Sequence, residues 1–218
     1  MCFSPAASFT AAAVTAALGL IAISRGKTLR DLPLAATPVL FAAQQGVEGF
    51  IWLRMPMTPH ATLTGPLVLA YLIIAQAFWP IFSPVAMWCL EPDASRRRLI
   101  PPFIAVGAAV SGYMLWGLLT GAPVASVGNM HIVYGAGQVH MTLAGAGYLA
   151  VVTLPLFMSS YRSVVIFGAI ITVGSLVAYV AYLTAFPSVW CFFAAIASMA
   201  VIGHFEVVRR RSPRPVPA

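Results

Sequence analysis

Charged residues are scarce in this chain of 218 residues. Only 8% of its residues carry a formal charge and 61% are hydrophobic, whereas soluble globular domains contain about 25% charged residues. The mean hydropathy of +0.92 excludes an ordinary soluble domain. The apolar stretches are continuous rather than alternating, and a chain in hydrocarbon must satisfy its backbone hydrogen bonds internally. We therefore expect an all-α, multi-pass membrane protein in contact with a lipid bilayer.

Several functional classes lack the residues that they require. The only lysine, Lys27, lies between apolar runs, so no span offers an amine for a retinal Schiff base. His204 has no second histidine at equal depth, which argues against a bis-histidine haem. The zinc motifs HExxH and CxxC are absent. The net charge of +7 comes from short basic clusters between apolar runs, so no nucleic-acid partner is expected.

Seven apolar runs are long enough to cross a bilayer at about 20 residues per helix. They cover residues 6–24, 32–53, 66–90, 99–120, 140–159, 164–186 and 188–208. Residues 1–208 are thus expected to form one seven-helix transmembrane domain, followed by a disordered basic tail at 209–218. No basic residue precedes the first run, so we expect it to remain a helix rather than act as a cleavable signal peptide.

The basic residues predict the orientation of these spans. All of them except Arg54 fall on connections that share one side of the membrane. Cytoplasmic connections carry an excess of lysine and arginine. We therefore expect a multi-pass protein of the cell membrane, with the N-terminus outside and the C-terminus in the cytoplasm. The residues on the cytoplasmic side are Arg25, Lys27, Arg30, Arg96, Arg97, Arg98, Arg162, Arg209, Arg210, Arg211 and Arg214.

One predicted span contains a carboxylate, in the stretch FAAQQGVEGFIWL at residues 41–53. At 1.5 Å per residue, Glu48 lies roughly 7 to 8 Å below the outer end of its helix. Gln44, Gln45 and Trp52 share its helix face, because they lie three or four residues away. Ionisable residues within spans usually serve function. The alternative is a structural carboxyl, hydrogen-bonded to Gln44 or to a neighbouring helix.

Thiols and imidazoles are expected on the same outer side. Cys2 precedes the first span, and Cys191 lies near the outer end of the seventh. His131 and His140 belong to the outer connection and to the start of the fifth span. Each histidine has an alternative role as a hydrogen-bonded loop residue. Cys2 and Cys191 have the alternative of a structural disulfide.

Cysteine, histidine and glutamate are the ligands that zinc and related metals prefer. We therefore predict an outward-facing site for a divalent transition metal such as zinc, in which Glu48 acts as a general base, suited to hydrolysis or hydration of a small or lipid-like ligand. Its predicted metal ligands are Cys2, Glu48, His131, His140 and Cys191. Its predicted pocket residues are Gln44, Gln45, Trp52, Gln76, Tyr134 and Trp190.

Gln76 lies near the middle of the third span, ahead of Pro80 and Pro84. Proline removes an internal hydrogen bond and kinks a helix, which in a bundle often opens a cavity. We predict Gln76 as the floor of the pocket under Glu48. A kink that only improves packing is the alternative.

Four segments together resemble an uncharacterised family of small bacterial multi-pass membrane proteins that open with Met-Cys-Phe-Ser. These segments are MCFS at 1–4, QQGVEGFIW at 44–52, AQAFWPIFSP at 75–84 and SVWCFFAA at 188–195, with His131 between the last two. The resemblance brings no activity with it. It implies that the signature segments contain Cys2, Gln44, Gln45, Glu48, Gln76, His131, Trp190 and Cys191.

Two functions compete with a metal-dependent enzyme. In the first, Glu48 binds a proton or cation in a transporter or sensor, and Gln44, Gln45 and Gln76 line the path. In the second, the protein is structural, and a disulfide between Cys2 and Cys191 clamps the N-terminus onto the seventh span.

Overall fold

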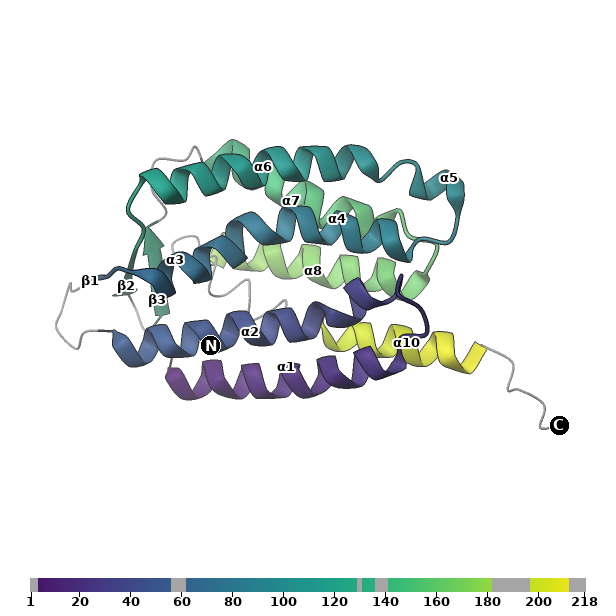
Figure 1. The fold of residues 1–218 in the computed structure, drawn as a ribbon, viewed down its shortest axis with the longest axis horizontal. Coiled ribbons are helices and arrows are strands. Elements are labelled where there is room, and N and C mark those ends of the chain that lie inside the picture. Colours follow the sequence, from purple (N-terminus) through teal and green to yellow (C-terminus); the bar gives the residue numbers. More distant parts are fainter. Residues whose placement is uncertain (1–3, 56–61, 129–130, 136–140, 182–196, 212–218) are drawn as a thin grey trace.

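The computed structural model describes residues 4–55, 62–128, 131–135, 141–181 and 197–211 (Figure 1). The chain is mostly helical, and its long helices run side by side along one axis. These helices are α1 (Pro5–Arg25), α2 (Leu32–Arg54), α3 (Pro66–Leu72), α4 (Trp79–Leu90), α6 (Pro101–Thr120), α7 (Met141–Phe157), α8 (Arg162–Ala181) and α10 (Met199–Arg211). A π-helix, η1 (Ile73–Phe78), joins α3 to α4, and a short helix, α5 (Ala94–Arg97), precedes α6.

The helices begin and end close to the limits of the predicted apolar runs. Three of them, over Pro5–Arg25, Pro66–Leu90 and Ala94–Thr120, are long and apolar enough to cross a membrane. The prediction of a mostly helical chain is confirmed. Residues 188–196 of the run predicted at 188–208 lie outside the described residues, so only 197–208 can be compared.

A small sheet departs from the all-α prediction. Strands β1 (Thr62–Leu63), β2 (Val124–Gly128) and β3 (His131–Gly135) form an antiparallel sheet in the order β1-β2-β3. The register of β2 and β3 pairs Ala125 with Tyr134. The valines, isoleucine and tyrosine in the connection between α6 and α7 favour strands, so this connection is not an irregular loop. Pairing within the sheet also satisfies backbone groups that a loop over a helix bundle leaves exposed.

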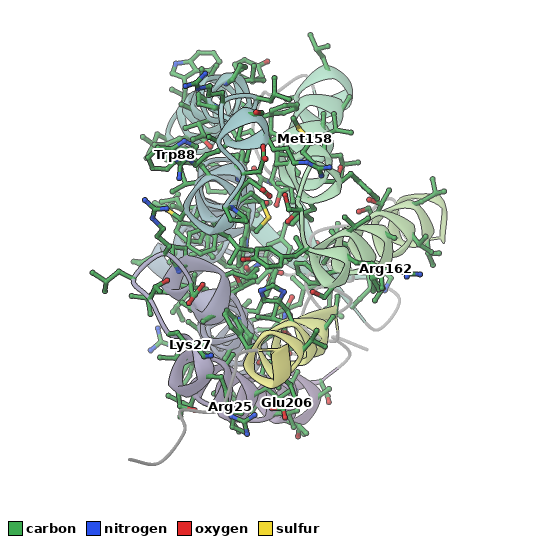
Figure 2. The ribbon with its side chains drawn as sticks, turned by 90° about the vertical axis from the view of Figure 1, so that its right-hand side faces the viewer. Arg25, Lys27, Trp88, Met158, Arg162 and Glu206 are labelled. Carbon is green, nitrogen blue, oxygen red and sulfur yellow. The ribbon has the colours of Figure 1, made fainter. Side chains whose placement is uncertain are left out.

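The two ends of the bundle differ in character. The sheet and α3 lie at one end, and α5 lies at the other (Figure 1). Figure 2 views the α5 end, where Arg25, Lys27 and Arg162 surround the helix ends together with Glu206. Because these helices alternate in direction, residues in the second half of α2 lie near the sheet.

The helices close into a ring in which α2, α4, α7, α8, α10 and α1 contact one another in turn. Helix α6 packs outside this ring against α4 and α7. Its closest approach is at Gly107, where an added Cβ would overlap the carbonyl oxygen of Pro80. The absence of a side chain at this position therefore sets how closely α6 approaches α4.

Replacing Gly107 by alanine should destabilise the protein by about 1 to 3 kcal/mol, because the new methyl group meets rigid backbone. Gly112 lies in the same helix and has open space around it. Gly112→Ala should therefore be neutral or stabilising by up to about 1 kcal/mol. Thermal unfolding of both variants in detergent measures the difference, and equal effects would contradict this packing.

Candidate functional site

Three polar side chains of α2 are completely buried near the sheet end. Gln44, Gln45 and Glu48 are each 0% exposed. They lie three or four residues apart and so share the helix face that the sequence predicts. Burying a polar group without a hydrogen-bond partner costs about 1 to 3 kcal/mol. The surrounding elements must therefore supply partners to this helix face.

Helix α4 supplies the partner of Gln44. The indole Nε1 of Trp79 donates a hydrogen bond to Gln44 Oε1 over 2.9 Å. The indole ring stacks on Phe41, with ring centroids 4.1 Å apart and an interplanar angle of 18°. The stacking orients the ring, and the hydrogen bond then holds the Gln44 amide in one rotamer.

The sheet supplies a partner to Glu48. The hydroxyl of Tyr134 on β3 donates to Glu48 Oε1 over 3.4 Å, which is a long hydrogen bond. The Tyr134 ring stacks on Tyr71 of α3, with centroids 4.6 Å apart and an interplanar angle of 16°. The sheet thus covers the end of the bundle and brings a phenol to the buried carboxylate. This contact joins two residues that the sequence predicted for one site.

Another buried polar residue of the predicted pocket lies in the π-helix η1. Gln76 lies within it and is 6% exposed. In the π register each carbonyl pairs with the N–H five residues on, and for Ala75 that position is Pro80, which has no N–H. The hydroxyl of Tyr148 on α7 donates to the Ala75 carbonyl instead, over 2.9 Å. The kink predicted from proline is therefore a π-helix with a dedicated side-chain partner.

Several buried polar atoms of α2 and η1 make no hydrogen bond within the described structure. They are Gln45 Nε2, Gln45 Oε1, Trp52 Nε1 and Gln76 Oε1. Native proteins leave few such groups, and each calls for a water molecule, an ion or a ligand. Two of these atoms are donors and two are acceptors. The side chains of Gln45, Trp52 and Gln76 therefore have unused hydrogen-bonding capacity.

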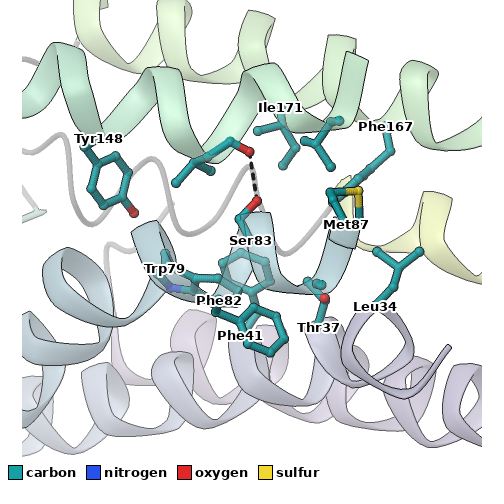
Figure 3. Close-up of a pocket in the computed structure, with 13 residues that line it drawn as sticks. Leu34, Thr37, Phe41, Trp79, Phe82, Ser83, Met87, Tyr148, Phe167 and Ile171 are labelled. Atoms are coloured by element: carbon teal, nitrogen blue, oxygen red, sulfur yellow. Dashed lines mark hydrogen bonds between the residues drawn. The ribbon is translucent and has the colours of Figure 1, made fainter. Parts of the chain in front are cut away.

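A cavity of about 40 Å³ lies in the middle of the bundle, between α2, α4, α7 and α8. Figure 3 shows its lining, which is dominated by aromatic and aliphatic side chains. Its polar groups already have partners within the protein: Ser83 donates to the Val152 carbonyl and Thr37 donates to the Pro33 carbonyl. Trp79 lines the cavity as well. Neither Gln76 nor Glu48 lines it, so it is separate from the pocket predicted under Glu48.

The predicted metal ligands are only partly described. Cys2, His140 and Cys191 lie outside the described residues, as does the predicted pocket residue Trp190. His131 is 8% exposed and begins β3. Because side chains alternate along a strand, His131 lies on the face of β3 opposite Tyr134, which contacts Glu48. Within the described ranges no three histidine, cysteine or acidic side chains group as metal ligands, so the zinc site stays a prediction.

The acidic residues at the α5 end are engaged inside the molecule. Glu91 is 2% exposed and accepts hydrogen bonds from the backbone N–H and hydroxyl of Ser160. Glu206 pairs with Arg25.

Burial raises the pKa of the Tyr161 phenol above its ordinary value, and the nearby carboxylates of Asp31 and Glu91 contribute to the increase.

Trp79 and Tyr148 were not predicted as parts of the site. Each contacts it from a different helix, and pairings between helices cannot be read from one sequence. A signal was nevertheless present, because the N–H of a buried tryptophan and the hydroxyl of a buried tyrosine usually find hydrogen-bond partners. An aromatic residue with a polar group in the middle of an apolar run therefore predicts a polar neighbour.

A protein-family model matches the chain over residues 1–218. The matched description is "Family of unknown function (DUF6629)". The chain belongs to this family. The match confirms the resemblance to an uncharacterised family that the signature segments indicated. No curated protein and no solved structure matches the DUF6629 chain.

In the DUF6629 chain, Trp79→Phe should keep the stacking on Phe41 and remove the donor to Gln44 Oε1. We expect a loss of about 1 to 3 kcal/mol in unfolding free energy, the usual cost of removing the partner of a buried polar group. Trp88→Phe is the control, because Trp88 is 44% exposed and should change stability by less than about 0.5 kcal/mol. Equal losses in the two variants would contradict the role of the indole N–H.

Proposed function

We propose that the DUF6629 chain is an integral membrane protein that binds a proton or a small cation at Glu48, as part of transport or sensing. The supporting observation is the complete burial of Gln44, Gln45 and Glu48 on one face of α2, with neither atom of the Gln45 amide hydrogen-bonded within the described structure. A buried carboxylate in a membrane helix is most often a functional group.

The outward faces of the helices support a location in the bilayer. Large apolar side chains on α1, α6 and α8 are exposed where a soluble protein would carry polar ones. Examples are Leu20, Val106, Leu119, Ile166, Val173 and Leu176. Trp88 is exposed near the α5 end and Trp116 near the sheet end. Exposed tryptophans at both ends resemble the aromatic belts at the two surfaces of a membrane.

The charge difference between the ends supports an orientation in which the sheet faces outward. Arg30, Arg98 and Arg162 at the α5 end have no acidic partner in the described part of the chain, while Glu91 and Glu206 at that end do have partners. Such an excess of unpaired arginine is typical of a cytoplasmic surface. In this proposal seven spans place the N-terminus outside, the C-terminus in the cytoplasm and Glu48 in the outer half.

Cysteine labelling of intact bacterial cells tests this orientation. In a variant without native cysteines, Val127→Cys in the sheet should react with a membrane-impermeant maleimide from outside. Leu29→Cys at the α5 end should react only after the membrane is opened. Both positions are exposed, at 48% and 88%. The opposite pattern would overturn the orientation.

The donor set around Glu48 suits a small hard cation. Carboxylate and amide oxygens are preferred by such ions, and Gln45 Oε1 and Gln76 Oε1 both have unused acceptor capacity. A proton bound at Glu48 would compete with the cation. Binding to the folded state alone stabilises a protein by about 2.7 kcal/mol at a ligand concentration one hundred times the Kd.

Thermal unfolding over a series of Na⁺ and K⁺ concentrations and pH values tests the proposal. The wild type should gain stability with one of these cations, and acid should weaken that gain. Glu48→Gln should abolish the gain. Glu91→Gln is the matched control, because Glu91 is also buried but lies at the opposite end, and it should keep the gain. A full cation response in Glu48→Gln would rule the proposal out.

A further inference from the structure

The path of η1 depends on a backbone group that the helix itself cannot satisfy. A helix in a membrane, or in the core of a bundle, must pair every backbone carbonyl. Pro80 removes the N–H that the Ala75 carbonyl would use in the π register. In the described structure this carbonyl accepts its hydrogen bond from the hydroxyl of Tyr148. Tyr148 therefore replaces a missing main-chain donor.

The contact is well suited to this role. Tyr148 is 6% exposed, and its ring lies against the mid-bundle cavity while its hydroxyl reaches η1. Figure 3 shows Tyr148 and Trp79 among the residues that line this cavity. The Ala75 side chain is buried too, so water has little access to the carbonyl. A phenylalanine at position 148 would fill the same space but leave the carbonyl without this donor.

Gln76 is the residue affected by this arrangement. It follows Ala75 directly in η1, so the register of η1 sets the direction of its side chain. Helix α2 is antiparallel to α3 and α4, and Trp79 meets Gln44. One turn further along both helices, the region of Ala75 and Gln76 comes level with Glu48. The amide oxygen of Gln76 is buried there without a hydrogen-bond partner in the described ranges.

We propose that Tyr148 is a positioning residue for the Glu48 site: it fixes the π register of η1 through the Ala75 carbonyl and thereby sets the Gln76 amide at the level of Glu48. This inference rests on the function proposed above. Tyr148 does not contact the cation itself. It acts through η1, and Pro80 is what makes its hydroxyl necessary.

A double-mutant cycle tests the link between Tyr148 and Pro80 without any ligand. Tyr148→Phe should lower the midpoint of thermal unfolding, because the Ala75 carbonyl loses its donor. In a Pro80→Ala background residue 80 has an N–H, so the same Tyr148→Phe change should lower the midpoint far less. Contacting groups that depend on each other show such non-additivity. Additive effects would overturn the proposal.

Binding of the cation tests the positioning role. With the cation identified for the wild type as probe, Tyr148→Phe should weaken the apparent affinity at least tenfold. Pro80→Ala should weaken it similarly, because η1 can return to the α register and turn Gln76. The double variant should bind no more weakly than Pro80→Ala alone.

Ser83→Ala is the matched control, because it removes another hydrogen bond from a hydroxyl to a carbonyl between α4 and α7. It should lower stability but leave the affinity unchanged. If Tyr148→Phe behaves in the same way, the positioning role is wrong while the Glu48 proposal stands. If the wild type shows no response that depends on Glu48, both proposals fail.

Discussion

The burial of two amides and one carboxylate on a single face of α2 is the constraint to which the sheet end of the molecule is adjusted. Gln44 takes its donor from Trp79 on α4, and Glu48 receives the phenol of Tyr134 from a strand. Each partner is oriented by an aromatic stack, with Phe41 in the first case and Tyr71 in the second. The ring stacks orient donors that a polar helix face needs when water is absent.

Much of the helical framework could be predicted from the sequence, because long apolar runs bounded by proline, glycine or arginine leave few alternatives to helices. The position of Glu48 and its neighbours on one helix face also followed from spacing alone. The sheet did not, because five-residue strands next to a long apolar run give little periodic signal. The contacts of Trp79 and Tyr148 depend on which helices are neighbours and on how far these helices are shifted along the bundle axis. A single sequence gives neither piece of information. The sequence predicted His131 and Glu48 in one site, because it does not show that His131 lies on a strand. A strand directs successive side chains to opposite faces, so His131 and Tyr134 lie on different faces of β3.

Buried polar side chains have different kinds of hydrogen-bond partner at the two ends of the bundle. At the α5 end the buried Glu91 accepts hydrogen bonds from Ser160 in the loop between α7 and α8. At the sheet end the polar groups meet aromatic donors from distant parts of the chain, and Gln45 is left without a hydrogen bond in the described structure. Both carboxylate oxygens of Glu91 accept hydrogen bonds within the protein. The sheet end retains capacity, which is why we assign binding to it.

The cavity in the middle of the bundle has a consequence for the movement of ions. Its lining is mostly hydrocarbon, and Trp79, which lines it, also donates a hydrogen bond to the amide of Gln44. An ion in this cavity would find few polar groups to replace its water, because the polar groups of the lining are already hydrogen-bonded within the protein. The indole of Trp79 therefore lies between an apolar space and a buried amide, and a change in its rotamer would break its hydrogen bond to Gln44.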